Sequence, residues 1–421
     1  MTAKTISEQI LSAKSGRDAR AGDVVVCAVD WILGTDASAP MAIDYFERMG
    51  GERLFDPTRV RFAFDHYSSP ASPKTAAFHE RVRSFAARHG AEVWDVGEGI
   101  SFQLLVERGD ALPGQLVIGA DSHTVTCGTL NLFASGVGSS DLAAAMLTGQ
   151  AWFRVPETIK VVLTGRRASD LSAKDAALAL VAAIGAEGVN YQALEFHGPA
   201  VAAFSLEERL VFSNLAVETG AKAAIFPADT ETYTYLGGRT TQRGTPVTAG
   251  PGARYSRELV LDLSTLSPRV ALPHSPDRVV PLAQALGTPV QMIFLGTCTG
   301  GRVQDFHEAL ATLERAGGRV AAGVQLVVTP ASREVRDRLL ADGTLRKLEA
   351  MGAIVTAVGC GACCGTSGVI PGDGTNVLST ANRNFKARMG NATASIYLAS
   401  PAACAAAAAS GRITDPRTVG A

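Results

Sequence analysis

Two glycine-rich segments contain four of the seven cysteines, and any fold of this chain must accommodate both segments. Three of the seven cysteines fall within one of them, Val358-Gly359-Cys360-Gly361-Ala362-Cys363-Cys364-Gly365. A fourth, Cys298, lies in Leu295-Gly296-Thr297-Cys298-Thr299-Gly300-Gly301-Arg302. Glycine permits sharp backbone turns with positive φ, which can carry small side chains onto one inorganic centre. A C-x2-C pair with one distant cysteine predicts a three-thiolate site, which leaves a metal coordination position open. We interpret it as an iron–sulfur cluster with one iron free to bind substrate.

The cysteine pattern leaves alternatives open. Cys360 and Cys363 are the preferred ligands beside Cys298, and Cys364 could replace Cys363 by a slip of one residue. A structural zinc site would need a fourth ligand, and no second C-x2-C or H-x3-H pair lies nearby. A thioredoxin-type redox pair or inert buried thiols are further interpretations. The remaining cysteines lie in apolar or small-residue surroundings and are expected to be ordinary core residues: Cys27, Cys127 and Cys404.

Length and charge limit the class of protein. A chain of 421 residues should hold two to four domains. Its formal net charge of −1, without a basic run, argues against nucleic acid or an anionic membrane as a partner. The uneven cysteine spacing suggests a reducing compartment. Because no apolar run approaches the ~20 residues that span a bilayer, we expect a soluble, cytoplasmic protein.

Predicted strands alternate with predicted helices along the chain, which indicates parallel α/β layers. We expect three α/β units, over residues 1–155, 156–270 and 271–421. Residues 24–29 predict a buried strand, 31–40 a loop, and the polar residues 229–256 another loop. Strands are also predicted directly before Asp65, Asp121, Cys298 and Cys360, where open α/β sheets place their ligand-binding residues.

Two acid–histidine motifs follow these strands: Asp65-His66 and Asp121-Ser122-His123. An adjacent carboxylate can orient a histidine and raise its pKa, which keeps the imidazole protonated as an acid. One such dipeptide has a structural role as often as a functional one, but two at strand ends favour catalysis. Glu195, between Leu194 and Phe196, is either a solvated glutamate or a carboxylate near a metal-bound water.

Residues 379–390 contain Arg383, Lys386 and Arg388. Arginine side chains bind carboxylates in bidentate fashion, so this segment predicts contacts with a substrate that carries several carboxylates. A solvated basic loop is the alternative.

Several segments, in this order, resemble the aconitase superfamily, and in particular the large subunits of two-chain 3-isopropylmalate dehydratases and homoaconitases. They are Gly119-Ala120-Asp121-Ser122-His123-Thr124, Gly136-Val137-Gly138-Ser139-Ser140-Asp141, Leu194-Glu195-Phe196-His197-Gly198, Pro273-His274-Ser275-Pro276-Asp277, Thr297-Cys298-Thr299, the C-x2-C pair and Asn382-Arg383-Asn384-Phe385. The resemblance implies three α/β/α domains arranged around a cluster-binding cleft.

The resemblance also implies roles for single residues. Cys298, Cys360 and Cys363 match the family's ligands to a 4Fe–4S cluster with one open iron, which acts as a Lewis acid. His66, paired with Asp65, resembles the acid that protonates the departing hydroxyl. Asp121, His123 and Glu195 resemble residues around the iron-bound water and hydroxyl. Ser122, Arg383 and Arg388 resemble the substrate-binding residues. The implied reaction is reversible dehydration of a hydroxy di- or tricarboxylic acid.

One element of the family pattern is missing. Its general base is a serine in a glycine-serine-serine-arginine loop of a swivelling domain, and Gly138-Ser139-Ser140-Asp141 belongs to a different motif. The resemblance therefore implies a separate small subunit that carries the base. 3-Isopropylmalate is the favoured substrate, with homoaconitate and citramalate- or dimethylmalate-type acids as alternatives. A non-catalytic protein that responds to iron or redox state is the alternative from another class.

Overall fold

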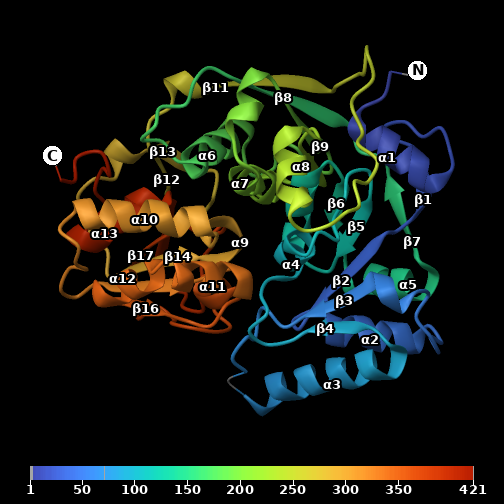
Figure 1. The fold of residues 1–421 in the computed structure, drawn as a ribbon, viewed down its shortest axis with the longest axis horizontal. Coiled ribbons are helices and arrows are strands. Elements are labelled where there is room, and N and C mark those ends of the chain that lie inside the picture. Colours follow the sequence, from blue (N-terminus) through green and yellow to red (C-terminus); the bar gives the residue numbers. More distant parts are fainter. Residues whose placement is uncertain (1–2, 71, 421) are drawn as a thin grey trace.

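The computed structural model describes residues 3–70 and 72–420. Three mainly parallel sheets, of five, four and seven strands, follow one another along the chain, and a two-stranded ribbon joins the first of them. The early, middle and late parts of the chain occupy successive regions of the molecule (Figure 1). The predicted α/β class is confirmed.

The first sheet is parallel throughout. Its strands in spatial order are β4 (Glu92–Trp94), β3 (Val60–Ala63), β2 (Trp31–Thr35), β5 (Leu116–Gly119) and β6 (Phe133–Gly136). Its helices are α1 (Ile6–Ser15), α2 (Ala39–Arg48), α3 (Pro73–His89), α4 (Ser101–Glu107) and α5 (Ser139–Thr148). Asp65-His66 follows β3 and Asp121 follows β5, so both motifs lie at the same edge of this sheet, as predicted.

Two local predictions in this part were wrong. The segment 31–40 was predicted as a loop but begins with β2, the central strand of the sheet. The prediction failed because three consecutive apolar residues are too few to identify a strand by pattern alone. The strand β1 (Val24–Ala28) is only half buried, with Val24 62% and Val26 54% exposed. It pairs with β7 (Gln150–Arg154) in an antiparallel ribbon, so alternate side chains face solvent.

The second sheet is also parallel. Its strands in spatial order are β10 (Ala223–Ile225), β9 (Ala193–His197), β8 (Thr158–Thr164) and β11 (Arg257–Asp262). Helices α6 (Ala173–Ile184) and α7 (Leu206–Ala216) belong to this part of the chain. The polar segment 229–256, predicted as loop, opens with α8 (Thr230–Gly237), which a capping box between Asp229 and Thr232 initiates.

The third sheet is mixed, because β12 runs antiparallel to both of its neighbours. Its strands in spatial order are β13 (Val279–Pro281), β12 (Arg269–Ala271), β18 (Ser395–Ala399), β17 (Asn376–Ser379), β14 (Met292–Gly296), β15 (Gln325–Thr329) and β16 (Ala353–Val355). Its helices are α9 (Thr297–Gly300), α10 (Val303–Arg315), α11 (Arg333–Ala341), α12 (Thr344–Ala350) and α13 (Pro401–Ser410). Cys298 lies on α9, directly after β14, and Cys360 lies in the segment that follows β16.

The hydrophobic cores cross from one sheet to the next. Ala193, Ala223 and Ile225 of the second sheet pack into the core of the first, and Met292 and Phe294 of the third pack with α6 and α7. Division into domains at residues 155 and 270 therefore stays a prediction. Cys27, Cys127 and Cys404 are fully buried in these cores, as expected.

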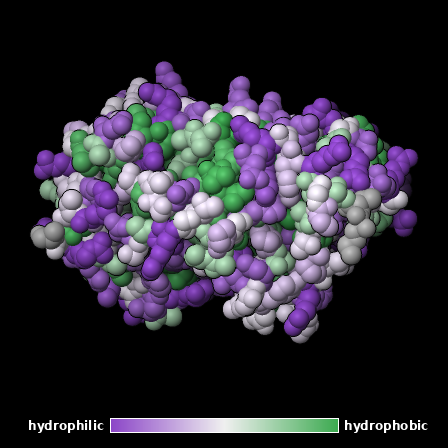
Figure 2. Space-filling view, turned by 90° about the horizontal axis from the view of Figure 1, so that it is seen from above, coloured by the Kyte–Doolittle hydropathy of each residue, from purple (hydrophilic) through white to green (hydrophobic). Residues whose placement is uncertain are grey.

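Hydrophilic side chains cover much of the face shown in Figure 2, with apolar residues between them. Within residues 3–70 and 72–420, no helix is both long and apolar enough to cross a bilayer.

Candidate active site

The Asp65-His66 pair is held at the end of β3. The imidazole Nδ1 of His66 lies 2.7 Å from Asp65 Oδ1, and the backbone N–H of Ser101 donates to Asp65 Oδ2 at 2.9 Å. Asp65 is fully buried, whereas the side chain of His66 remains 18% exposed. The carboxylate therefore fixes the ring and leaves its Nε2 side toward Asp121, whose Oδ2 lies 3.6 Å away.

Electrostatics favour a protonated His66. Burial lowers the pKa of His66, but the carboxylates of Asp65 and Asp121 outweigh burial and raise that pKa well above its ordinary value. Burial raises the pKa of Asp65 to about 6, against the attraction of His66. At neutral pH the pair is thus a carboxylate beside an imidazolium, which can donate a proton.

A second carboxylate, which the sequence analysis missed, shapes the backbone here. Asp36 is fully buried and accepts hydrogen bonds from the backbone N–H groups of His66 (3.0 Å) and Tyr67 (2.8 Å). His79 of α3 contacts its Oδ2 at 3.1 Å. Asp36 thereby fixes the turn that presents His66.

The second motif starts the 3-10 helix η2 (Ser122–Leu130). Asp121 caps this helix, because its Oδ1 accepts a hydrogen bond from the backbone N–H of His123 at 2.7 Å. Burial would raise the pKa of Asp121, but the hydrogen bond and charge of His123, together with the charge of His66, hold it well below its usual range. The Nε2 of His123 lies 2.8 Å from Glu218 Oε1, so this imidazole is enclosed between two carboxylates.

Glu218 joins three distant parts of the chain. It lies directly after α7, contacts His123, and accepts hydrogen bonds from Arg383 Nε at 2.9 and 3.0 Å. Burial raises its pKa, but His123 and then Arg383 outweigh burial and lower it. The Nη2 of Arg383 also donates to Ser122 Oγ at 3.0 Å. The structure therefore brings together His123, Ser122 and Arg383 from the predicted set, through a residue that was not predicted.

The predicted cysteine ligands are free thiols in the same region. Cys298 and Cys363 are each 4% exposed, and Cys360 is half-buried. The backbone N–H of Cys360 donates to Asp65 O at 2.8 Å, which ties the cysteine segment to the end of β3. Cys364 is half-buried as well, but its Sγ lies 2.7 Å from Thr366 Oγ1.

Amide and guanidinium groups surround these sulfurs. Asn382 Nδ2 donates to Cys298 Sγ at 3.3 Å, and its Oδ1 lies 3.5 Å from Cys363 Sγ. Arg388 Nη2 lies 3.8 Å from Cys363 Sγ, while the buried Nε of Arg388 has no hydrogen-bond partner within the described part of the chain. Gly300 is required for packing, since a Cβ there would lie 2.4 Å from Cβ of Thr380.

The chemistry of these donors fits a metal cluster. Burial raises the pKa of Cys298 to about 12 and also raises the pKa of Cys363; a hydrogen bond with Cys364, together with burial, raises that of Cys360. A bound metal ion deprotonates a coordinating thiol, so these sulfurs would become thiolates when a metal centre binds. Three sulfurs and the unpartnered Nε of Arg388 are therefore consistent with a metal–sulfur centre and an anion beside it.

Glu195 lies elsewhere. Its Oε1 accepts hydrogen bonds from the backbone N–H groups of Ile6 (2.6 Å) and Ser7 (3.3 Å) at the start of α1, and Tyr255 donates to its Oε2 at 3.1 Å. This fully buried carboxylate stabilises a helix N-terminus. The structure thus explains its burial without a catalytic role and does not bring it to His66 or Asp121.

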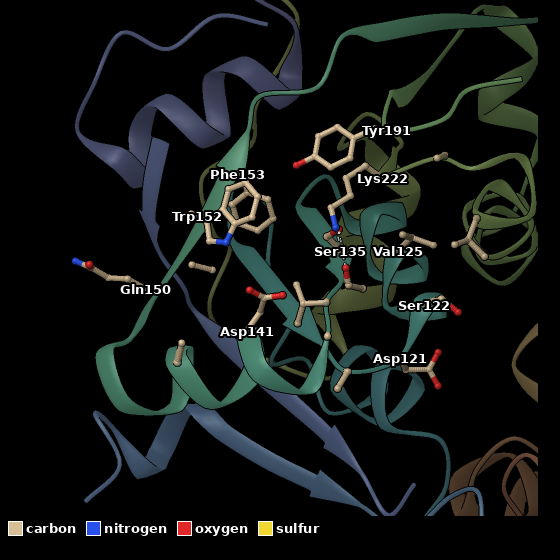
Figure 3. A pocket seen from close by; sticks show the side chains of 18 of the residues that line it. Asp121, Ser122, Val125, Ser135, Asp141, Gln150, Trp152, Phe153, Tyr191 and Lys222 are labelled. Carbon is tan, nitrogen blue, oxygen red and sulfur yellow. Dashed lines mark hydrogen bonds between the residues drawn. The ribbon is translucent and has the colours of Figure 1, made fainter. Parts of the chain in front are cut away.

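A cavity of about 660 Å³ touches the site at one edge. Asp121 and Ser122 lie on one side of it and Trp152, Tyr191 and Lys222 on the other (Figure 3). The side chains of Asp121 and Ser122 point away from the centre of this cavity (Figure 3).

The Aconitase family (aconitate hydratase) matches residues 8–289 and 283–411, which is nearly the whole chain. The chain belongs to the aconitase family. It is an aconitase-family hydro-lyase, and the predicted membership and enzyme class are confirmed.

The 3-isopropylmalate dehydratase large subunit 1 of Methanopyrus kandleri is 44% identical over 98% of this chain and 99% of its own length. Large subunit 2 of Archaeoglobus fulgidus is 43% identical over 98% and 99%, and large subunit 1 of Thermotoga maritima 42% over the same shares. Among solved structures, holo-form aconitase X of Thermococcus kodakaraensis aligns over 90% of this chain and 88% of its own with a TM-score of 0.47 at 10% identity. Membership in the family implies an iron–sulfur cluster, in keeping with the buried cysteines.

Proposed function

We propose that this chain is the large subunit of a 4Fe–4S hydro-lyase that reversibly dehydrates a hydroxy di- or tricarboxylic acid, with 3-isopropylmalate as the preferred substrate. The observation that carries the proposal is the convergence of His66, Asp121 and Arg383 with the cysteine segments, although these residues come from different sheets. Such a dehydration requires a proton donor, an arginine that binds the substrate carboxylates, and three thiolates that hold the cluster.

Cys298, Cys360 and Cys363 would hold the cluster. Cys363 is preferred to Cys364 because Asn382 and Arg388 contact its sulfur, whereas Cys364 turns to Thr366. When bound, the cluster supplies an open iron that acts as a Lewis acid on the hydroxyl to be removed.

His66 is the proposed acid. Its imidazolium is oriented by Asp65 at Nδ1 and carries the transferable proton at Nε2, which faces Asp121. A proton given to the departing hydroxyl makes water the leaving group, and the reverse step removes a proton from an incoming water. Asp121 and His123 line the same space, and Glu218 contacts His123, whereas Glu195 contacts α1 and Tyr255.

Ser122, Arg383 and Arg388 are proposed to bind the substrate carboxylates. Arg383 is anchored through its Nε to Glu218, so its position does not depend on substrate. Arg388 has a buried Nε that a carboxylate oxygen would satisfy. Rigid guanidinium groups of this kind favour bidentate recognition of carboxylates.

We further propose a small-subunit partner. The relatives from Methanopyrus, Archaeoglobus and Thermotoga are each named as large subunits. The glycine-serine-serine-arginine loop that carries the family's general-base serine has no match in this sequence. The partner would supply that base and part of the substrate specificity.

The test combines metal analysis with reconstitution. Anaerobically purified protein should contain about 4 iron and 4 sulfide per chain. Mixed with a co-expressed small chain, it should dehydrate 3-isopropylmalate faster than homoaconitate, citramalate or dimethylmalate. Stoichiometric zinc without sulfide would refute the mechanism. Preference for another acid would change the proposed substrate and leave the proposed reaction class in place.

A further inference from the structure

We propose that Asp65, His66 and Cys360 form a second metal site, which binds one zinc-type divalent cation when the cluster is absent. One carboxylate oxygen, one imidazole nitrogen and one thiol sulfur of these residues all lie within 4.8 Å of one another. Carboxylate, imidazole and thiolate are the donors that Zn²⁺ takes from proteins, so binding would release one proton from the His66 imidazolium and one from the Cys360 thiol to solvent. Bonds of about 2.0–2.3 Å to a tetrahedral ion set donors roughly 3.3–3.8 Å apart. The contact of 2.7 Å between Asp65 Oδ1 and His66 Nδ1 would therefore open slightly around a bound cation.

The three donors are positioned before any cation arrives. The backbone N–H of Cys360 donates to the carbonyl oxygen of Asp65 at 2.8 Å, which holds the cysteine beside the end of β3. Gly359 makes this approach possible, because it has φ +133° and a Cβ there would lie 2.8 Å from Asp65 O. Ser101 fixes the carboxylate by donating to Asp65 Oδ2, which leaves Oδ1 beside His66.

The site is partly exposed to solvent. Asp65 is fully buried, while His66 and Cys360 are partly exposed, so a cation can enter and retain a water as its fourth ligand. Three protein ligands with one open position are typical of reactive rather than structural zinc sites.

The single cation and the cluster would compete for the sulfur of Cys360. This part of the inference rests on the proposed cluster ligands. Cys360 is shared by the two sites, whereas Asp65 and His66 belong to the mononuclear site and Cys298 and Cys363 to the cluster. A bound zinc-type cation therefore blocks cluster loading and occupies the proposed acid. The metal that the unloaded chain meets first would decide whether it becomes active.

The experiment uses the full-length chain freed of metal under anaerobic conditions and titrated with Co²⁺ as a spectroscopic substitute for zinc. We expect one equivalent to bind, with a thiolate-to-cobalt charge-transfer band and X-ray absorption showing one sulfur ligand. Asp65→Asn and His66→Gln should each weaken Co²⁺ binding by at least about tenfold, the lower end of what even outer-shell losses cost. Cys298→Ser should bind Co²⁺ as the unaltered chain does.

Three sulfur ligands around the cobalt, or loss of binding in Cys298→Ser, would show that the cation sits on the cluster cysteines and would overturn the proposal. Absence of Co²⁺ binding would overturn it as well. X-ray absorption of the unaltered chain decides the matter even if a variant folds poorly. Iron and sulfide loading, measured separately, should remain normal in His66→Gln; failure of loading in every chain would refute the proposed cluster while leaving the cobalt result to stand.

Discussion

The two acid–histidine motifs look alike in sequence but differ in their surroundings. His66 is held at one nitrogen by Asp65 and keeps an 18% exposed side chain, with its other nitrogen 3.6 Å from Asp121. His123 has a 6% exposed side chain, and its nitrogens face Asp121 and Glu218. We therefore propose that the first imidazole exchanges a proton with a ligand, whereas the second is held in place by its two carboxylate neighbours. The identity of the neighbours therefore decides the role.

The largest expected effect separates the two histidines. His66→Asn removes the proposed acid and should lower kcat by about 10²- to 10⁴-fold, the usual contribution of general acid–base catalysis. His123→Asn should lower kcat less and should destabilise the fold by about 1–3 kcal/mol, because Glu218 loses a buried partner. Steady-state kinetics and chemical denaturation of cluster-loaded protein test both, and equal losses of kcat would refute the distinction.

Glu218→Gln removes the negative charge that His123 and Arg383 both contact. We expect kcat/KM to fall roughly 10- to 100-fold, mainly through a higher KM, since misplacement of a substrate-binding group by about 1 Å can cost that much. Kinetics on reconstituted enzyme measure the effect. A variant with unchanged KM would show that Arg383 does not depend on Glu218.

The pH profile tests the influence of Asp65. The carboxylate raises the pKa of His66, so its removal in Asp65→Asn lowers that pKa. Because the acid must be protonated, the alkaline limb of kcat/KM should move to lower pH by about one unit or more, as expected for a lost neighbouring charge. A shift to higher pH would contradict the proposed protonation state.

The smallest effect on activity is expected from Glu195→Gln, which lies outside both motifs. It should leave kcat and KM unchanged and lower the free energy of unfolding by about 1–2 kcal/mol, because the N–H groups of Ile6 and Ser7 lose a charged acceptor. Denaturant titration measures the loss. A large fall in kcat would restore Glu195 as a catalytic candidate.

Local pattern predicted the elements that carry the motifs. Alternating strands and helices indicated the parallel sheets, and β3, β5 and β14 end where Asp65, Asp121 and Cys298 were expected to begin their segments. The glycines beside the cysteines are sterically required, because a Cβ at Gly359 would lie within 3 Å of Asp65 and a Cβ at Gly361 within 3 Å of Thr329. These features depend on neighbours in sequence.

Long-range partners were not predictable in the same way. Alternation in β9 placed Glu195 opposite Leu194 and Phe196, but what covers that face is α1, 189 positions earlier. Glu218 stands in an apolar stretch after α7, and its partners His123 and Arg383 are 95 and 165 positions away. An isolated acid in an apolar stretch was the available signal. The pairing itself comes from the tertiary fold.

The position of Glu218 also means that the site forms only when three distant parts of the chain have folded together. Its contacts unite η2 of the first sheet, the end of α7 and the loop that bears Arg383. A chain in which the end of α7 is still unfolded lacks the Glu218 contacts of both Arg383 and His123, and one in which either of the other two parts is unfolded lacks one of these contacts. Newly made chains would therefore remain inert toward carboxylic acids until the last segment docks, and substitutions far from the centre that loosen this docking would present as enzyme defects before they present as unfolding.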